Sequence, residues 1–247
     1  MLNQPTEIAA AALALFLAYG LRAVTGFGSA LVSVPLLSLF LPLQLVVPWI
    51  VALDVAAAFL LTGASWRKRE VDWGEIRWLL PPALLGILLG LVLLVELPQR
   101  ALALGLGGLI ILFGLRSLLD LHGERPISRG WAVPAGALGG AIGSLFATGG
   151  PPFVIYLSHR IRNKVHLRAT LSGLFLIEGG LRLIAFVAAG LLAQEGMVLA
   201  LLLGAPVMGL ALFAGHHVHL SMSQRQVFRL VGVLLVVSGC ALIWRWL

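Results

Sequence analysis

Long apolar runs separated by short polar connectors dominate the chain. Six of these runs approach or exceed twenty residues, at 44–65, 74–95, 100–119, 168–190, 195–215 and 226–246. A helix of about 20 apolar residues spans a bilayer, so each of the six is long enough to cross. The runs at 7–24 and 130–146 are nearly long enough, whereas 28–41 and 148–158 are short. Ten-residue alternating segments, which are typical of outer-membrane strands, do not occur. The pattern predicts an all-α integral membrane protein with about eight to ten helices.

Composition supports this prediction and excludes soluble classes of protein. Hydrophobic residues make up 60% of the 247 residues and charged residues 11%, and the mean hydropathy is +1.03. A soluble domain carries about 25% charged residues, so a cytosolic enzyme, a secreted domain and a disordered chain are all excluded. The net charge of +7 does not indicate a nucleic-acid partner, because the basic residues lie in connectors between apolar runs. The single cysteine, Cys240, excludes a disulfide scaffold.

The two halves of the chain resemble each other. Matching residues recur at an offset of 121 to 125 positions: Gly28-Ser29 with Gly149-Gly150, Gln99-Arg100 with Gln224-Arg225, Gly107 with Gly232, and Gly114 with Gly239. Each half also reads as a run, a glycine-rich break, a short run and three full runs. We therefore expect one transmembrane domain made of two repeats, residues 1–122 and 123–247. Each repeat would contain a broken or hairpin helix pair followed by three transmembrane helices.

The basic residues predict that the two repeats are inverted. If 7–41 and 130–158 each crossed the membrane once, the positive charges would divide almost evenly between the two sides. If each stretch entered and left on one face, thirteen would share one side: Arg67, Lys68, Arg69, Arg77, Arg116, Arg125, Arg129, Arg160, Arg162, Lys164, Arg168, Arg225 and Arg229. Positive connectors stay in the cytoplasm, which favours the second arrangement. The charges leave open whether the hairpin arms cross fully or end within the membrane.

The glycine-rich breaks are candidate substrate sites. They read Thr25-Gly26-Phe27-Gly28-Ser29 and Thr148-Gly149-Gly150-Pro151-Pro152. Interrupted segments at corresponding positions of two halves point to the binding site of a transporter. A new helix N-terminus offers free N–H groups and a positive dipole end to an anion. The alternative is that these glycines only allow close helix packing. The predicted substrate-binding residues are Arg22, Thr25, Gly26, Phe27, Gly28, Ser29, Thr148, Gly149, Gly150 and Pro151.

These motifs resemble signatures of a known family. The stretch from Thr25 to Pro35 is similar to the first signature of the sulfite exporter TauE/SafE family of membrane permeases. The stretches Gly149–Tyr156 and Leu167–Leu171 are similar to its second signature, and the likeness extends over nearly the whole chain. The resemblance implies transport of sulfite or a small organosulfonate anion. It does not identify the molecule.

Ionisable residues within the apolar runs are functional candidates, because charge at membrane depth is costly. Arg22 precedes the first break and either attracts the anion or pairs with Asp54 in the next full run. Asp54 is alternatively a proton carrier. Glu178 and Arg182 are four residues apart, in the favourable order for an ion pair within one helix. If they do not pair, Glu178 is the better candidate for proton coupling.

The sequence favours transport over catalysis. No nucleophile set, phosphate loop or carboxylate pair indicates an enzyme, and we expect no cofactor. His216 and His219 share a helical face near His217, but an interfacial polar cluster is favoured over a metal site. We expect a multi-pass inner-membrane permease that moves a small anion by alternating access, with proton coupling as the favoured energy source. An uncoupled channel or uniporter, a non-transporting membrane subunit and a homodimeric state are left open. Membrane lipids are the other expected partner.

Overall fold

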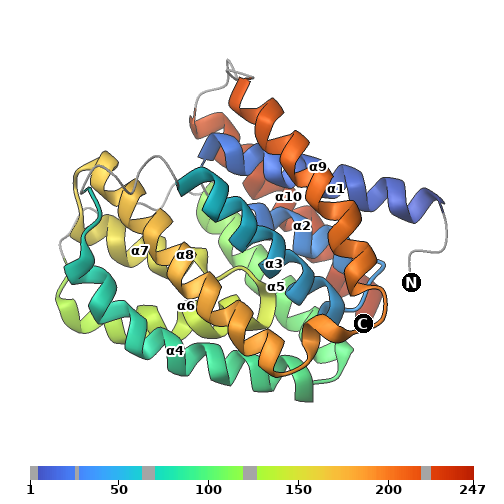
Figure 1. Ribbon diagram of the computed structural model, residues 1–247, viewed down its shortest axis with the longest axis horizontal. Helices are drawn as coiled ribbons and strands as arrows, with labels where there is room; N and C mark the ends of the chain where they lie inside the picture. The colour runs from blue at the N-terminus through green and yellow to red at the C-terminus, as the bar shows by residue number, and fades with distance from the viewer. Residues whose placement is uncertain (1–4, 26–27, 63–69, 119–126, 218–223) are drawn as a thin grey trace.

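Every regular element in the described part of the chain is helical. The computed structural model describes residues 5–25, 28–62, 70–118, 127–217 and 224–247 (Figure 1). The first half contains α1 (Pro5–Thr25), α2 (Ser29–Ser38), α3 (Leu43–Thr62), α4 (Trp73–Glu96) and α5 (Gln99–Leu118). The second contains η2 (Arg129–Trp131), α6 (Ala132–Phe146), α7 (Gly150–Arg160), α8 (Lys164–Ala188), η3 (Leu191–Ala193), α9 (Met197–His217) and α10 (Gln224–Trp246). The predicted all-α fold is confirmed.

Six helices of the described chain are long and apolar enough to cross a membrane. Their candidate spans are Thr6–Ala23, Leu43–Leu60, Trp73–Glu96, Gln99–Leu118, Val165–Ala188 and Met197–Gly215. The run at 7–24, which the sequence placed just below the limit, is therefore included. The run at 226–246 counts only as a shorter apolar helix, because its searched part begins at Gly232. These spans confirm a multi-pass membrane protein.

The two helices that follow the breaks are too short to cross. The α2 helix has 10 residues and α7 has 11. At about 1.5 Å per residue each reaches about 15–17 Å, roughly half of a hydrocarbon core of about 30 Å. Neither helix begins with a side-chain cap. By contrast, α4 is capped by Asp72, whose Oδ1 accepts a hydrogen bond from the N–H of Glu75, and α8 is capped by Asn163. The breaks therefore leave helix N-termini without a capping side chain.

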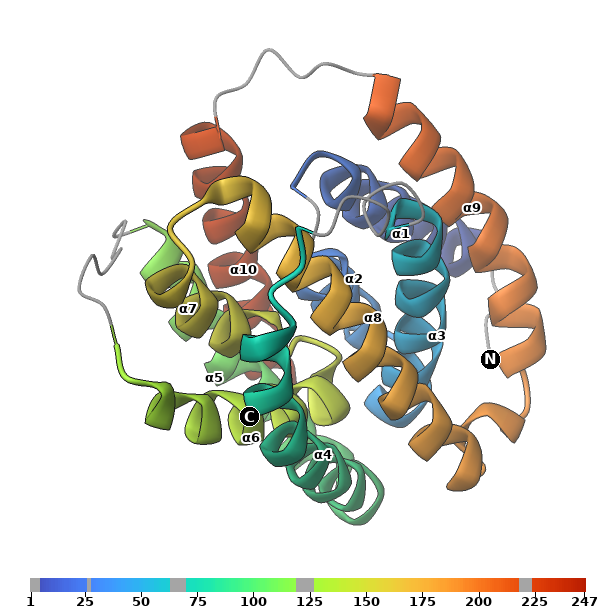
Figure 2. The same ribbon diagram turned by 60° about the vertical axis from the view of Figure 1, so that its left-hand side comes forward.

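The two halves interleave. Within the described chain, α1 packs along α9 and α4 packs along α6, while α5 packs along α10 and α3 along α8. Figures 1 and 2 show helices of the second half lying between those of the first. In chain order, α1 of the first half corresponds to α6 of the second, and α4 corresponds to α9. The pair α1 with α9 therefore becomes the pair α6 with α4 when the two halves are exchanged. These four helix pairs are thus the same from either half, whereas the contact of α2 with α10 has no recorded counterpart between α7 and α5 in the described chain.

Close contacts at equivalent residues support that correspondence. A Cβ added to Gly90 on α4 would lie 2.9 Å from the Cβ of Ser144 on α6. A Cβ added to Gly215 on α9 would lie 2.7 Å from the Cβ of Ala23 on α1. Gly215 follows Gly90 by 125 positions, and Ser144 follows Ala23 by 121. At these positions the two halves therefore share residue-level packing as well as the order of hydropathy.

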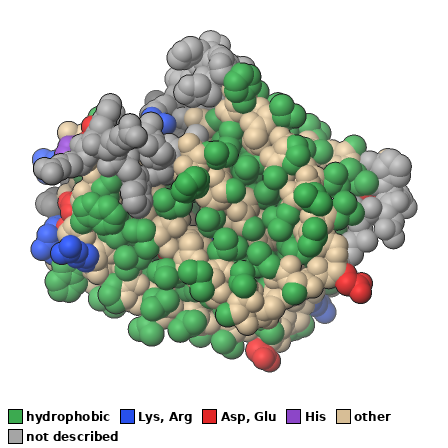
Figure 3. All heavy atoms as spheres, viewed as in Figure 1, with side chains coloured by type: hydrophobic (Ala, Val, Ile, Leu, Met, Phe, Trp, Pro, Cys, Tyr) green, Lys and Arg blue, Asp and Glu red, His purple; other side chains and the backbone are tan. Residues whose placement is uncertain are grey.

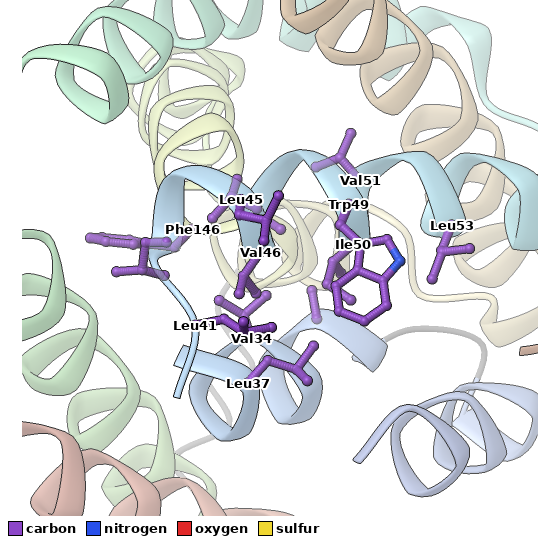
Figure 4. Packing of buried hydrophobic residues seen from close by; sticks show 14 of the residues in the cluster. Val34, Leu37, Leu41, Leu45, Val46, Trp49, Ile50, Val51, Leu53 and Phe146 are labelled. Carbon is purple, nitrogen blue, oxygen red and sulfur yellow. The ribbon is translucent and has the colours of Figure 1, made fainter. Parts of the chain in front are cut away.

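Apolar side chains occupy both the core and much of the outer surface. Figure 4 shows Val34 and Leu37 of α2 facing Val46, Trp49 and Ile50 of α3, and all five are buried. This contact fixes the short α2 against a full-length helix. On the outside, Leu85, Ile184 and Leu202 are between 67% and 70% exposed. Figure 3 shows hydrophobic side chains across most of one face, as a surface in contact with lipid requires.

A buried carboxylate holds one end of the molecule together. One oxygen of Glu75, at the start of α4, accepts hydrogen bonds from the Nη2 of Arg160 at 2.8 Å and the Nε of Arg129 at 3.3 Å. Its other oxygen accepts a hydrogen bond from the hydroxyl of Tyr156 at 2.6 Å. Because Arg129 precedes α6 and Arg160 ends α7, residues 130–158 begin and end at the same end of the molecule. Which side of the membrane this end faces stays a prediction.

Candidate functional site

Both breaks line a single cavity inside the helix bundle. Its volume is about 70 Å³, well above the roughly 10–15 Å³ that one water molecule needs. The residues it takes from the first break are Gly28, Ser29, Ala30 and Leu31, and those from the second are Ala147, Thr148, Gly149, Gly150 and Pro151. Segments about 120 residues apart in sequence thus meet at a space of the size of a small anion.

The structure brings most of the predicted site residues together. Ten of them line this cavity: Arg22, Gly28, Ser29, Asp54, Thr148, Gly149, Gly150, Pro151, Glu178 and Arg182. Gly26, Phe27 and the side chain of Thr25 lie outside the described part of the chain. The shared location is a geometric fact, whereas substrate binding by these residues stays a prediction.

The first break supplies backbone donors. Gly28 caps α2 with φ of 96°, a left-handed conformation that disfavours residues with a Cβ. The first amides of an α-helix have no acceptor within that helix, so Ser29, Ala30 and Leu31 present N–H groups at the cavity. The positive end of the α2 dipole lies at the same place. This N-terminus is therefore suited to a negative charge.

The second break differs from the first in its donors. Ala147 turns the chain with φ of 57°, and α7 then begins with Gly150, Pro151 and Pro152. Proline fits the first turn of a helix but has no N–H. Consequently, α7 offers the cavity its dipole and the amide of Gly150, but fewer backbone donors than α2. Thr148 adds a hydroxyl that is 2% exposed, and its Oγ1 has no hydrogen-bond partner among the described residues.

Arg22 and Asp54 form one ion pair at the cavity. The Nη1 of Arg22 lies 2.6 Å from the Oδ1 of Asp54 and donates to the Oγ of Ser29 at 3.0 Å. Ser29 in turn donates to Asp54 Oδ1 at 2.7 Å, and the hydroxyl of Tyr19 donates to the same oxygen at 2.8 Å. Arg22 therefore pairs with Asp54, which was one of the two roles predicted for it. The sequence analysis missed Tyr19, although it lies one turn before Arg22 on the same helix.

Glu178 and Arg182 form the second ion pair. The Nη2 of Arg182 donates to the Oε1 of Glu178 within α8, and the two residues are 6% and 2% exposed respectively. The Arg182 guanidinium lies on Gly143 of α6, where a Cβ would be 2.7 Å from its central carbon. Any larger residue at position 143 would therefore displace this pair. The ion pair predicted between Glu178 and Arg182, four residues apart on one helix, is therefore present.

The residues of the two ion pairs lie at related positions in the two halves, a correspondence that the sequence prediction did not include. Glu178 follows Asp54 by 124 positions, between the offsets of 121 and 125 that relate the breaks and the last helices of the two halves. Gly143 follows Arg22 by 121 positions, which places a glycine where the first repeat has its arginine. Arg182 comes from a different helix and lies against that glycine. Each repeat therefore brings one acid and one guanidinium to the cavity, by different routes.

The described residues contain no group of three His, Cys, Asp or Glu side chains that could hold a metal ion. His219 and the side chains of His216 and His217 lie outside the described part, so the expectation for that cluster is untested. The remainder of the cavity wall is apolar, with Val51 and Val55 from α3 and Phe175 from α8.

Comparison with known proteins agrees with the motifs. The family model described as sulfite exporter TauE/SafE matches residues 11–242. The chain is 29% identical over 202 residues to the probable inner membrane transporter protein TsaS of Comamonas testosteroni, covering 79% of this chain and 83% of that protein. No solved structure matches the chain significantly. Because the family model covers nearly all of the sequence, the chain belongs to the sulfite exporter TauE/SafE family of membrane transporters.

Proposed function

We propose that this protein is a secondary transporter that moves a small sulfur-containing anion, such as sulfite or an organosulfonate, across the inner membrane. The observation that carries the proposal is the cavity where two interrupted helices meet two guanidinium groups. Transporters place their substrates at such breaks between repeats. The family description names sulfite export, and the relative TsaS is named a probable inner membrane transporter; both support this substrate class and location.

Anion selectivity follows from the donors at the cavity. Helix N-termini favour negative charge through free amides and the dipole, and α2 and α7 both begin there. Guanidinium groups add planar donors suited to oxyanions. The hydroxyl of Thr148, without a partner among the described residues, is a further donor. The carboxylates of Asp54 and Glu178 also line the cavity and offset the charges of the two guanidinium groups.

We also propose that the two repeats have opposite orientations, as alternating access by inverted repeats requires. Contacts between α5 and α10 support this. A Cβ at Gly107 would lie 3.2 Å from the carbonyl oxygen of Gly239, and a Cβ at Gly114 would lie 2.9 Å from that of Gly232. Gly107 corresponds to Gly232 and Gly114 to Gly239 by the 125-residue offset. Each glycine therefore contacts the equivalent of the other, which requires two equivalent helices to run antiparallel.

The orientation is tested by labelling single cysteines in intact cells. Cys240 is the only cysteine, so Cys240→Ser gives a background without thiols. Arg162 and Glu195 are both exposed, in connectors before α8 and α9. We expect Glu195→Cys to react with a membrane-impermeant maleimide in intact cells, and Arg162→Cys to react only after permeabilisation. The reverse result would show that the orientation is wrong.

Transport by the pure protein in vesicles tests the function itself. We expect saturable sulfite counterflow, and faster uptake when a proton gradient is applied. Gly149→Leu should abolish counterflow, because a Cβ there already lies 3.0 Å from the Cα of Gly143. Gly108→Leu is the matched control, since nothing lies within 4 Å of its Cβ position. Both variants are compared at equal amounts of inserted protein.

The outcomes separate the alternatives. Normal transport by both Gly149→Leu and Gly28→Leu would refute the site. Equal rates with and without the gradient would leave an uncoupled uniporter, and flux without saturation or counterflow would indicate a channel. Absence of transport and of anion binding by the wild-type protein would indicate a non-transporting membrane subunit.

A further inference from the structure

We infer that the two ion pairs of the cavity have different tasks. Arg22 and Asp54 form a fixed pair that holds the first break in place. Glu178 and Arg182 form an exchangeable pair, in which a proton on Glu178 releases the guanidinium of Arg182 to bind the anion. This inference rests on the proposed function and names the proton site and the anion-binding cation within it.

The contacts of Asp54 explain why the first pair stays closed. Its Oδ1 receives Tyr19, Ser29 and Arg22 at 2.6 to 2.8 Å, and Arg22 also donates to the backbone carbonyl of Asp54 at 3.1 Å. These partners lie on α1 and α2, whereas Asp54 lies on α3. Protonating Asp54 would therefore weaken a junction of three helices.

Glu178 has far fewer contacts to lose. Among the described residues, its only recorded polar partner is Arg182, and the Nε of Arg182 has no partner. Both residues lie on α8, so separating them breaks no hydrogen bond recorded between helices of the described chain. Both also line the cavity, where an anion would take the place of the carboxylate beside the guanidinium. Protonation here exchanges one local ion pair for another.

The charge balance of the cavity favours this exchange. The charged side chains recorded in its lining are Arg22, Asp54, Glu178 and Arg182, which carry no net charge when all are ionised. An anion entering this neutral set would bring an uncompensated charge into a low-dielectric site, which is costly. One proton on Glu178 makes the set singly positive. A monoanion then restores neutrality, so proton and anion bind together.

The groups around Glu178 leave it as the exchangeable acid. The cavity lining contributed by α1 and α3 carries Arg22 and Asp54, which are bound to each other. Gly143 of α6 lies against Arg182 and Glu178, and α7 contributes Gly150 and Pro151 to the cavity wall; none of these residues is charged. On α4, Glu75 is bound by Arg129, Arg160 and Tyr156 near the start of α8, and η3 carries no ionisable residue.

The test measures binding of methanesulfonate to the purified full-length protein as a function of pH. A sulfonate stays a monoanion throughout, so any pH dependence belongs to the protein. We expect wild-type affinity to fall by about tenfold per pH unit over the range where Glu178 is ionised in the free protein, as linkage to one proton requires. Glu178→Gln should bind at every pH with the affinity of the wild type at acidic pH. Arg182→Gln should lose binding by at least tenfold.

The controls distinguish this inference from the proposed function. Tyr19→Phe, which removes one donor to Asp54, and Glu195→Gln, at an exposed acid, should keep the wild-type pH dependence. In vesicles, Glu178→Gln should still exchange sulfonate but no longer respond to a proton gradient. If the wild type binds neither methanesulfonate nor sulfite at any pH, the proposed function fails and this inference with it. If the wild type binds but Glu178→Gln keeps the wild-type slope, only this inference is overturned.

Discussion

Asp54→Asn removes the charge from a carboxylate that receives three donors on one oxygen. The substitution leaves the Arg22 guanidinium, whose side chain is 8% exposed, without its counter-charge inside the bundle. Removing one partner of a buried ion pair costs about 3–5 kcal/mol. The Asp54 side chain is 22% exposed, and asparagine keeps an oxygen acceptor. We therefore expect the lower end of that range, a loss of about 3 kcal/mol in the free energy of unfolding.

The assay is denaturant unfolding of the purified protein in one fixed detergent, compared with Glu195→Gln at an exposed position. The double substitution Arg22→Gln with Asp54→Asn removes both charges together. It should recover more than half of the lost free energy, because replacing a buried pair by neutral groups is often close to neutral. The reasoning is refuted if Asp54→Asn unfolds within about 0.5 kcal/mol of the wild type, or if the double variant is no more stable than the single one.

Three further changes test other parts of the structure. Gly90→Ala should lower stability by about 1–3 kcal/mol through overpacking against α6, while Gly209→Ala, with open space around its Cβ position, should have little effect in the same unfolding assay. Gly28→Ala should reduce stability by about 1–2 kcal/mol because of its φ of 96°; a thermal melt equal to that of the wild type would contradict this. Tyr156→Phe should cost about 1 kcal/mol, and should cost nothing further in a Glu75→Ala background.

Hydropathy and local spacing were enough to predict the helices and the breaks. Membrane helices satisfy their own backbone, so their positions depend on nearby residues. The ends of α1 and α6 and the starts of α2 and α7 followed from glycines and prolines at those positions. The pairing of Glu178 with Arg182 was predictable for the same reason, because four residues along a helix bring two side chains together.

Contacts between distant helices were not predictable in this way. The cluster around Glu75 joins residues 54 to 85 positions apart, and nothing in the local pattern distinguishes Arg129 and Arg160 from other connector charges. The sequence analysis treated both arginines only as indicators of membrane side. Likewise, the place of Arg182 on Gly143 depends on how α6 packs against α8. Only the offset of 124 positions between Asp54 and Glu178 could have indicated that the two acids occupy corresponding positions in the two halves.

The two repeats agree where helices pack and differ where the cavity lies. Gly90 and Gly215 make the same close contact, as do the paired glycines of α5 and α10. At the cavity, Ser29 corresponds to Gly150 and Arg22 to Gly143. A strictly symmetric site would give both carboxylates the same partners, and a proton would have no preference between them. The second repeat has glycine at both positions, which leaves Glu178 with a single local partner among the described residues. This difference between the halves is what allows one acid to stay paired while the other exchanges.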